Sequence, residues 1–380
     1  MSSSPLAITG WGSVSALGSD TATAVQGLRA GRRALGRARF SPHLSLTEAG
    51  EALVGEVPLE LEPQLRARQV LDQAVDEALA AAGPSPAITG VFVGTTGGFF
   101  VDAEVGLLEA RVVDPEAWPS LDQRGQGAVA ERVARRVGAR GPVLTYAMAC
   151  TSGAAALAAA ARHIRAGTCE RAVVVGFDML SNLTLRGFRG LMLYDPEPCR
   201  PFDARRKGLQ LGEGCGALVL ERRPGPYPVL GSDNHLDPSN LTASSTDGSS
   251  AAAVMAGALR ASGLEPDQVV TIKAHGTGTI DNDLGEGRGI AKLFGSTAPP
   301  FVSLKGAIGH SLGAAGVIEV VLWLAALQAG FRPGSVGYEQ LDPDIGVGPA
   351  AATGPALQGA HLFGAFGFGG SCVALVVADA

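Results

Sequence analysis

The stretch AMACTSGAAALAAAARHIRAG, residues 147–167, carries the clearest sign of the fold in this chain. A strand pattern leads into Cys150, and small residues, most of them alanine, follow it at helical length. Side chains of that size let a helix pack closely against its neighbours. A strand that runs into a closely packed helix is typical of an α/β fold.

Outward from this stretch, short β-rich runs alternate with Ala-rich helical patterns. The expected strands are PLAITG near the start and residues 87–95, 171–178, 216–221, 269–275 and 372–378. The expected helices are residues 70–83, 152–167, 250–263 and 313–330. This alternation predicts the α/β fold class.

The two halves of the chain have related layouts. A strand leads to Cys150 in the first half, and a strand ends at His275 in the second. Loops at strand ends are where α/β proteins usually place their sites. We expect an N-terminal half with the nucleophilic Cys, residues 1–225, and a C-terminal half with two His, residues 226–380. The segment 224–234 is the expected boundary between them.

Composition excludes several classes of protein. The 380 residues are 46% hydrophobic, enough for a large core, and the net charge of −6 argues against broad nucleic-acid binding. Five cysteines without a CxxC pair indicate a reducing compartment, with no disulfide framework or zinc site. The apolar stretch 316–329 is too short to span a bilayer, and no signal peptide is apparent. We therefore expect a cytoplasmic protein.

Cys150 is the candidate nucleophile. It stands at the expected start of a helix, where main-chain N–H groups and the helix dipole favour a thiolate and lower the thiol pKa. The alternative for an isolated cysteine is a buried structural thiol. We give that interpretation to the remaining four: Cys169, Cys199, Cys215 and Cys372.

Two of the six histidines lie in glycine-rich contexts. His275 follows a strand within KAHGTGT, and His310 lies in SLKGAIGHSLGAAG before a helix of small residues. Histidine can act as a general base or donate hydrogen bonds to a developing oxyanion. Taken singly, either histidine is equally compatible with a structural role.

Together these segments resemble the β-ketoacyl synthases, specifically the elongating acyl-carrier-protein type among the thiolase-like condensing enzymes. The matching motifs are A-C-x-S-G at 149–153, R-P-F-D at 200–203, L-G-E-G at 211–214, H-G-T-G-T at 275–279, an acid pair at Asp283 and Glu286, K-x-x-x-G-H at 305–310, and F-G-F-G-G at 366–370. They run in family order through nearly the whole chain. The resemblance implies a thiolase-like fold, with two related halves in α-β-α-β-α layers.

The resemblance also implies a reaction. Cys150 would attack an acyl thioester and hold the acyl group. A malonyl extender would then lose carbon dioxide, while His275 and His310 donate hydrogen bonds to the enolate oxygen. The main-chain N–H groups of Cys150 and Phe368 would bind the oxyanion of the condensation step.

Supporting roles follow from the same motifs. Lys305 would orient the histidine region, Glu286 would support that lysine, and Phe368 would gate the acyl pocket. Asp283 would be a further supporting residue. The further substrate-binding residues are expected to be Thr277, Thr279, Phe366 and Gly369. No step calls for a redox cofactor or a metal, and no metal-ligand cluster is visible along the chain.

The expected partner is an acidic acyl carrier protein. The candidate basic groups for docking it are Arg66, Arg68, Arg132, Arg135, Arg136, Arg205 and Arg206. Family members are usually dimers, so we expect either a homodimer or a heterodimer with a related subunit. We expect no nucleic-acid partner and no membrane span.

Some positions depart from the family pattern. Leu304 replaces a small polar residue, Gly364 and Ala365 replace polar residues, and Ile-Asp-Asn at 280–282 replaces a form that ends in glycine. These changes favour a specialised synthase, building a polyketide, a polyene or an unusual acyl chain, over routine fatty-acid elongation.

Three alternatives remain. A thiolase needs a second Cys in a C-x-G setting, whereas Cys372 is followed by Val-Ala. An initiating synthase usually has Asn where this chain has His310. A non-catalytic chain-length-factor-like subunit usually lacks the nucleophile, so Cys150 argues against it.

Overall fold

A computed structural model describes residues 5–41, 44, 52–85, 87–114, 125–239 and 245–379. In this part of the chain, ten strands form one sheet in the order β10-β9-β13-β14-β8-β1-β7-β6-β4-β5. These strands are β1 (Ala7–Val14), β4 (Thr89–Gly94), β5 (Val143–Tyr146), β6 (Arg171–Asp178), β7 (Gly214–Glu221), β8 (Tyr227–Leu236), β9 (Val269–Lys273), β10 (Phe301–Val302), β13 (Ala360–Gly367) and β14 (Ser371–Ala378). Two small sheets pair β2 (Gly36–Arg37) with β3 (Leu53–Val54) and β11 (Phe331–Arg332) with β12 (Gly354–Pro355).

The sheet consists of two copies of one topology. The order β1-β7-β6-β4-β5 in the first half matches β8-β14-β13-β9-β10 in the second, counted by each strand's rank within its half. The pairing directions match as well, since β4–β6 and β13–β9 are parallel while β6–β7 and β13–β14 are antiparallel. The halves join where β1 pairs with β8. The two related halves expected from the sequence are therefore present in the fold.

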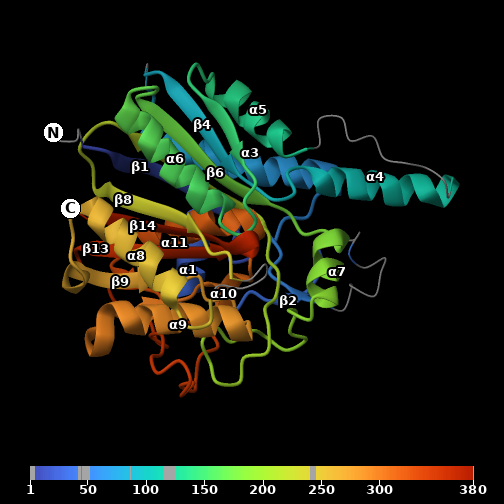
Figure 1. Cartoon of the computed structure of the whole chain (residues 1–380). Helices are drawn as coiled ribbons and strands as arrows, with labels where there is room; N and C mark the ends of the chain where they lie inside the picture. Colours follow the sequence, from blue (N-terminus) through green and yellow to red (C-terminus); the bar gives the residue numbers. More distant parts are fainter. Residues whose placement is uncertain are drawn as a thin grey trace.

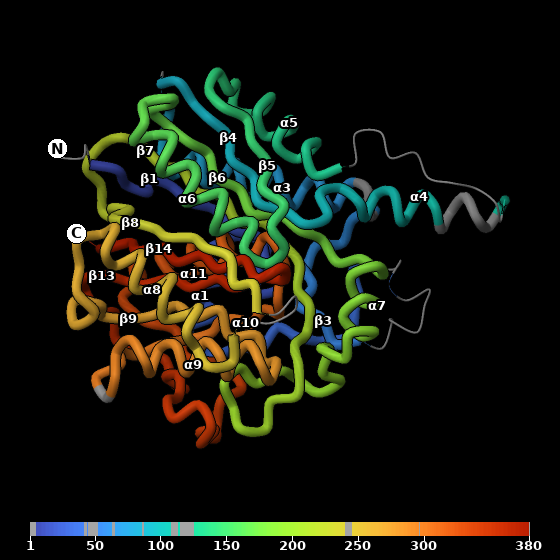
Figure 2. Tube along the Cα trace, in the orientation of Figure 1, coloured from blue at the N-terminus to red at the C-terminus, as the bar shows by residue number. Residues whose placement is uncertain are grey.

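Helices cover and separate the two halves of the sheet. They are α1 (Thr21–Arg29), α3 (Pro63–Ala82), α4 (Phe100–Val113), α5 (Gln126–Val137), α6 (Ser152–Ala166), α7 (Asn182–Gly190), α8 (Ser249–Ser262), α9 (Ile280–Phe294), α10 (Lys305–Ile308) and α11 (Ala315–Gln328). α6 and α11 contact each other and strands of the sheet from the middle of the molecule, while α3 and α5 cover the first half and α8 covers the second (Figures 1 and 2). This is the expected α-β-α-β-α layering.

The central helices pack closely because their residues are small. A Cβ atom on Gly316 of α11 would lie 2.4 Å from the main-chain nitrogen of Ala154 in α6. A Cβ atom on Gly153 would lie 2.8 Å from the carbonyl oxygen of Gly313. Real Cβ atoms do not approach that closely, so glycine is required at both positions. This close contact buries α6, as its composition predicts.

The segment 224–234, the expected boundary between the halves, lies mostly within a strand. From Tyr227 onward it is strand β8, and Pro228 pairs with Ala7 at the junction of the halves. A proline is tolerated there because it stands near the beginning of the strand. β13 was also missed as a strand, although its last residues were recognised as a motif.

Candidate active site

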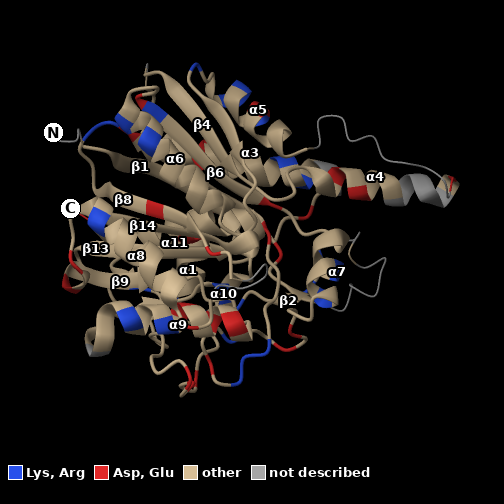
Figure 3. Ribbon diagram, in the orientation of Figure 1, with Lys and Arg blue, Asp and Glu red and all other residues tan. Residues whose placement is uncertain are grey.

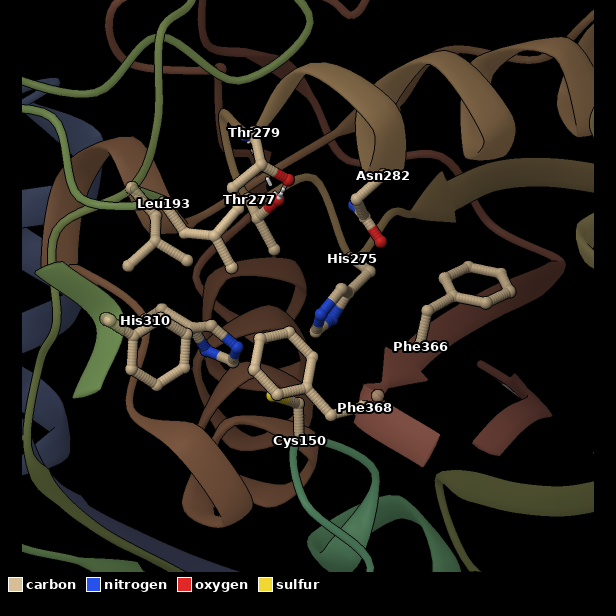
Figure 4. Close-up of a pocket in the computed structure, with 12 residues that line it drawn as sticks. Cys150, Leu193, His275, Thr277, Thr279, Asn282, His310, Phe366 and Phe368 are labelled. Atoms are coloured by element: carbon tan, nitrogen blue, oxygen red, sulfur yellow. Dashed lines mark hydrogen bonds between the residues drawn. The ribbon is translucent and has the colours of Figure 1, made fainter. Parts of the chain in front are cut away.

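One small pocket contains the three residues singled out by the sequence (Figure 4). The sulfur of Cys150 and ring nitrogens of His275 and His310 lie within 4.8 Å of one another. The two imidazole rings are perpendicular, with centroids 5.2 Å apart. The pocket is lined by Cys150, Phe188, Leu193, Leu209, His275, Thr277, Thr279, Asn282, His310, Phe366, Gly367 and Phe368.

A strained turn presents Cys150 to this pocket. Ala149 has a φ of 48°, which a residue with a Cβ atom rarely adopts. The Thr151 hydroxyl donates to the Met148 carbonyl at 2.8 Å, and the Ser152 hydroxyl donates to the Ala149 carbonyl at 2.6 Å. Hydrogen bonds of this kind hold strained backbone at functional sites.

Burial raises the pKa of the Cys150 thiol to about 11, against a usual 9.0. The charge of Lys305 and the main-chain N–H groups of Phe368 and Cys150 act in the opposite direction, since they favour the thiolate. The lowered pKa expected from the helix start is therefore wrong. Desolvation outweighs the favourable groups because the side chain is almost fully enclosed.

The surroundings of both histidines favour the neutral form of the ring. Burial, followed by the charge of Lys305, lowers the pKa of His275 and of His310 well below the usual 6.5. The Nζ atom of Lys305 lies 3.3 Å from Nδ1 of His275. An ammonium group only donates, so Nδ1 accepts and Nε2 of His275 carries the proton.

The His310 ring forms no hydrogen bond with the described residues. Both ring nitrogens are buried without a hydrogen bond to any described residue, although the residue is only 1% exposed. Its main chain is fixed instead, because its N–H donates to the Gln210 carbonyl at 2.8 Å. Buried polar atoms without partners are rare in proteins, so this ring is available to a bound molecule.

Lys305 is supported by a different acid from the one expected. Its Nζ atom donates to Oε1 of Glu319 at 2.6 Å and to the carbonyl of His275 at 2.7 Å. Glu286 instead accepts from the main-chain N–H groups of His275 at 2.6 Å and Gly276 at 2.7 Å. The expectation that Glu286 pairs with Lys305 is wrong, because its carboxylate faces the main chain of the H-G-T-G-T loop.

Asp283 fixes the rest of that loop. Its carboxylate accepts from the N–H groups of Thr277 at 2.8 Å and Gly278 at 3.0 Å. It also accepts from Phe202 at 2.7 Å, so it joins the loop to the R-P-F-D motif. Asp283 thus supports the main chain of the loop that follows His275.

The walls of the pocket differ in character. The hydroxyls of Thr277 and Thr279 lie 2.8 Å apart on a polar wall. The ring of Phe368 stacks on Phe188 of α7, with centroids 5.4 Å apart, and forms part of an apolar wall. Gly369 was expected to bind substrate, but Gly367, two residues earlier, lines the pocket instead. The backbone turns away at Gly369, which has a φ of 77° and is exposed.

Two family models match the chain. "Beta-ketoacyl synthase, N-terminal domain" matches residues 3–224, and "Beta-ketoacyl synthase, C-terminal domain" matches residues 229–339. The chain belongs to the β-ketoacyl synthase family.

Individual relatives of this β-ketoacyl synthase include three bacterial proteins. Nodulation protein E of Rhizobium sp. strain N33 is 31% identical over 373 residues, 89% of each chain. The 3-oxoacyl-[acyl-carrier-protein] synthase 2 of Mycobacterium bovis is 31% identical over 256 residues, 62% of this chain and 61% of the relative. Putative polyketide beta-ketoacyl synthase 1 of Streptomyces cyaneus is 32% identical over 259 residues, 62% of this chain and 60% of the relative.

A solved structure confirms the thiolase-like fold. The ishigamide ketosynthase/chain length factor superposes with a TM-score of 0.90 at 26% identity, over 100% of both chains. In the described part of this synthase, no helix is long and apolar enough to cross a membrane.

The fold also creates a group that could hold a metal, which was not visible along the chain. It consists of Cys150, His275 and His310. The ammonium group of Lys305 lies 3.3 Å from the His275 ring, and its charge opposes a second cation there. These residues therefore suit a negatively charged intermediate better than a metal ion.

The seven arginines of the proposed patch all pair with acidic residues. Figure 3 marks basic positions along the ribbon in blue and acidic positions in red. Arg66 is buried and pairs with Glu213, and Arg206 is buried and pairs with Asp342. The others pair with nearby acids: Arg68 with Asp102, Arg132 with Asp72, Arg135 with Glu131, Arg136 with Asp76, and Arg205 with Asp203. As a set, these arginines are not a free basic surface.

Several pocket and support residues were missed. Glu319 is the acid within the apolar run 316–329, and Lys273 is the charged residue of a buried strand. A charged residue in such a run is a usable signal, because it is rarely buried without a partner. Phe188, Leu193 and Leu209 carry no comparable signal, since packing between segments distant in sequence brings them to the pocket.

Proposed function

We propose that this chain catalyses a decarboxylative Claisen condensation, joining an acyl group held on Cys150 to a malonyl extender on acyl carrier protein. One observation carries the proposal. A thiol, two neutral imidazoles and two main-chain N–H groups converge on one pocket. This set supplies a nucleophile, a proton acceptor and hydrogen-bond donors for two different oxyanions.

The first step is acyl transfer. With a pKa of about 11, the Cys150 thiol keeps its proton at neutral pH. A neutral imidazole in reach of the sulfur takes that proton as the sulfur attacks the thioester carbonyl. The bond to the carrier thiol then breaks, and the carrier sulfur leaves with the proton.

The second step is loss of carbon dioxide from the malonyl group. The bond to the carboxylate breaks, and its electron pair forms an enolate with charge on the thioester oxygen. Nε2–H of His275 and a ring N–H of His310 donate to that oxygen. Because both rings are neutral, they bind the enolate oxygen without forming an ion pair with the malonyl carboxylate.

The third step forms the carbon–carbon bond. The enolate carbon attacks the acyl-Cys150 carbonyl, and the main-chain N–H groups of Cys150 and Phe368 hold the resulting oxyanion. The carbon–sulfur bond breaks, and the charge of Lys305 favours the departing thiolate. The thiolate then takes up one proton from solvent, which restores the starting enzyme.

We propose an acyl carrier protein and a second synthase subunit as the partners. Strand β5 is at the edge of the sheet, with Val143 40% exposed and Met148 37% exposed beyond its end. α4 projects away from the body (Figure 1). An edge strand and a projecting helix are surfaces that a partner subunit covers.

We assign the product to specialised polyketide or polyene biosynthesis, on the basis of the departures at 280–282, 304 and 364–365. The similarity to a polyketide synthase and to a ketosynthase/chain length factor supports this assignment. The second candidate is a non-catalytic chain-length-factor-like subunit. The observation that favours it is the same similarity to a ketosynthase/chain length factor.

The test separates these two candidates. Wild-type protein incubated with an acyl carrier protein donor should gain the acyl mass, and Cys150→Ala should not. Intact-protein mass spectrometry measures both, and circular dichroism checks that the variant is folded. Acylation of Cys150→Ala at the wild-type level removes this residue from the mechanism, and an unacylated wild type favours the non-catalytic subunit.

A further inference from the structure

A second buried lysine lies behind the histidine pair. Lys273 ends β9, two residues before His275, and is 2% exposed. Its Nζ atom donates to Oε2 of Glu319 at 2.5 Å and to the carbonyl of Gly364 at 3.0 Å. A lysine is rarely buried to this degree, so its charge requires an explanation.

Lys273 shares the carboxylate of Glu319 with Lys305. Glu319 gives Oε2 to Lys273 and Oε1 to Lys305, so two ammonium groups divide one negative charge. The three side chains therefore carry one net positive charge. Lys305 in turn contacts both Nδ1 and the carbonyl oxygen of His275. Without Lys273, the single negative charge of Glu319 would balance the single positive charge of Lys305.

Resting on the proposed function, we propose that Lys273 is a positioning residue for the condensation. By engaging half of Glu319, it leaves the charge of Lys305 uncompensated and thereby keeps His275 and His310 as neutral hydrogen-bond donors. The positive charges of both lysines oppose protonation of both rings.

Neutral rings matter for the chemistry. An imidazolium ion would form an ion pair with the malonyl carboxylate and stabilise the group that must leave as carbon dioxide. A protonated His275 would also direct an Nδ1–H group at the Lys305 ammonium, 3.3 Å away. A second positive charge behind Glu319 prevents both outcomes.

The other charged groups around this cluster are few. Glu286 of α9 acts on Lys273 from one side, and Lys305 acts on it from α10. Asp283 raises the pKa of Glu286, and Asp178 of β6 acts on Cys150. Within the described part of the chain, none of these acids forms an ion pair with Lys273 or Lys305, so Glu319 decides the balance.

The test changes the charge of the cluster in steps. Lys273→Met leaves one ammonium and one carboxylate, so we expect the imidazole pKa values to rise by about one unit. Lys273→Met combined with Glu319→Gln leaves Lys305 alone with one net positive charge, so these pKa values should return towards the wild type. Lys273→Arg retains the charge and should titrate like the wild type. Lys292→Met, on the exposed side of α9, is the matched control and should change nothing.

Two measurements follow these variants. Histidine NMR titration reports the charge of each ring without substrate, so it tests Lys273 even if the chain proves inactive. Malonyl decarboxylation against pH reports the consequence, and the acid limb for Lys273→Met should move to higher pH by about one unit. Unchanged imidazole titration in Lys273→Met overturns the proposal. The proposal is also overturned if the double variant or Lys273→Arg shows the same imidazole pKa values as Lys273→Met.

Discussion

The thiol of Cys150 is less acidic than a solvent-exposed cysteine, although it lies at the start of a helix. Burial raises its pKa to about 11, and Lys305 is the leading influence in the opposite direction. Its reactivity therefore depends on a base within the pocket. This arrangement protects the thiol from chance alkylation at neutral pH while leaving it ready for a thioester placed beside a neutral imidazole.

Alkylation of Cys150 tests this description. With iodoacetamide, the rate should keep rising with pH above 9, because the thiolate forms only as the pH approaches about 11. Lys305→Met removes the favourable charge, so the rate at pH 9 should fall by about three- to tenfold. Mass spectrometry of the peptide containing Cys150 measures both. Lys292→Met should react like the wild type, and a rate that levels off near pH 7 would contradict the burial argument.

His275 and His310 should affect the second step of the reaction more than the first. Removing one donor to a developing oxyanion slows reactions by about 10²- to 10³-fold. We therefore expect His275→Ala and His310→Ala each to slow malonyl decarboxylation by that factor and to slow acylation of Cys150 less. Release of carbon dioxide and the mass of the acyl-enzyme measure the two steps separately. The reverse order would assign the histidines to the thiol.

At the scale of elements, the sequence predicts those parts whose patterns are local. β6 lies at the expected 171–178, and α6 ends within one residue of the expected 152–167, because buried valines and small alanines specify them directly. β8 could not be recognised, since its proline is permitted only by its place at the junction of the halves. The partners of Glu319 could not be read from the sequence either, because they come from two other segments.

The candidate site shows the same division. Cys150, His275 and His310 are visible because their motifs surround them with glycine and small residues. The acidity of the thiol and the acid that supports Lys305 were mispredicted, since both depend on burial and on side chains distant in sequence. The sequence motifs therefore identify which residues form the site, but not how burial changes their acidity.

The contact between α6 and α11 yields a prediction about stability. Gly316→Val would place Cβ 2.4 Å from the nitrogen of Ala154, so backbone must move, and we expect a loss of about 1–3 kcal/mol in the free energy of unfolding. Gly187→Ala in α7 is the matched control, with no atom within 4 Å of its new Cβ. It should stabilise the protein by about 0.5–1 kcal/mol, as alanine does in a helix. Urea denaturation compares them, and equal effects would contradict the packing argument.

At the scale of the whole molecule, the fold buries ionisable groups where its two halves meet. The pKa of Asp178 is raised to about 6 and that of Glu286 to about 7, both by burial. Asp178 accepts N–H groups from the loop after β4 and from Gly313 before α11, and Glu286 accepts them from the H-G-T-G-T loop. The site is thus held by carboxylates that are costly to ionise, so part of the protein's stability is given up to fix its loops.

The stability cost of burying the Glu286 carboxylate can be measured. Its pKa is about 7 in the folded protein against a usual 4.5, so its contribution to stability is fully present below pH 4.5 and is lost as the pH rises through 7. Between pH 5 and pH 8 this group alone should lower the free energy of unfolding by about 2–3 kcal/mol. Glu286→Gln cannot titrate, so the fall between those two pH values should shrink by that amount, whereas Glu131→Gln on the surface should leave it unchanged. Urea unfolding at both pH values decides the matter: an equal fall in wild type and Glu286→Gln would mean that the buried carboxylate is already ionised at pH 5 and that its bonds to the loop carry no penalty.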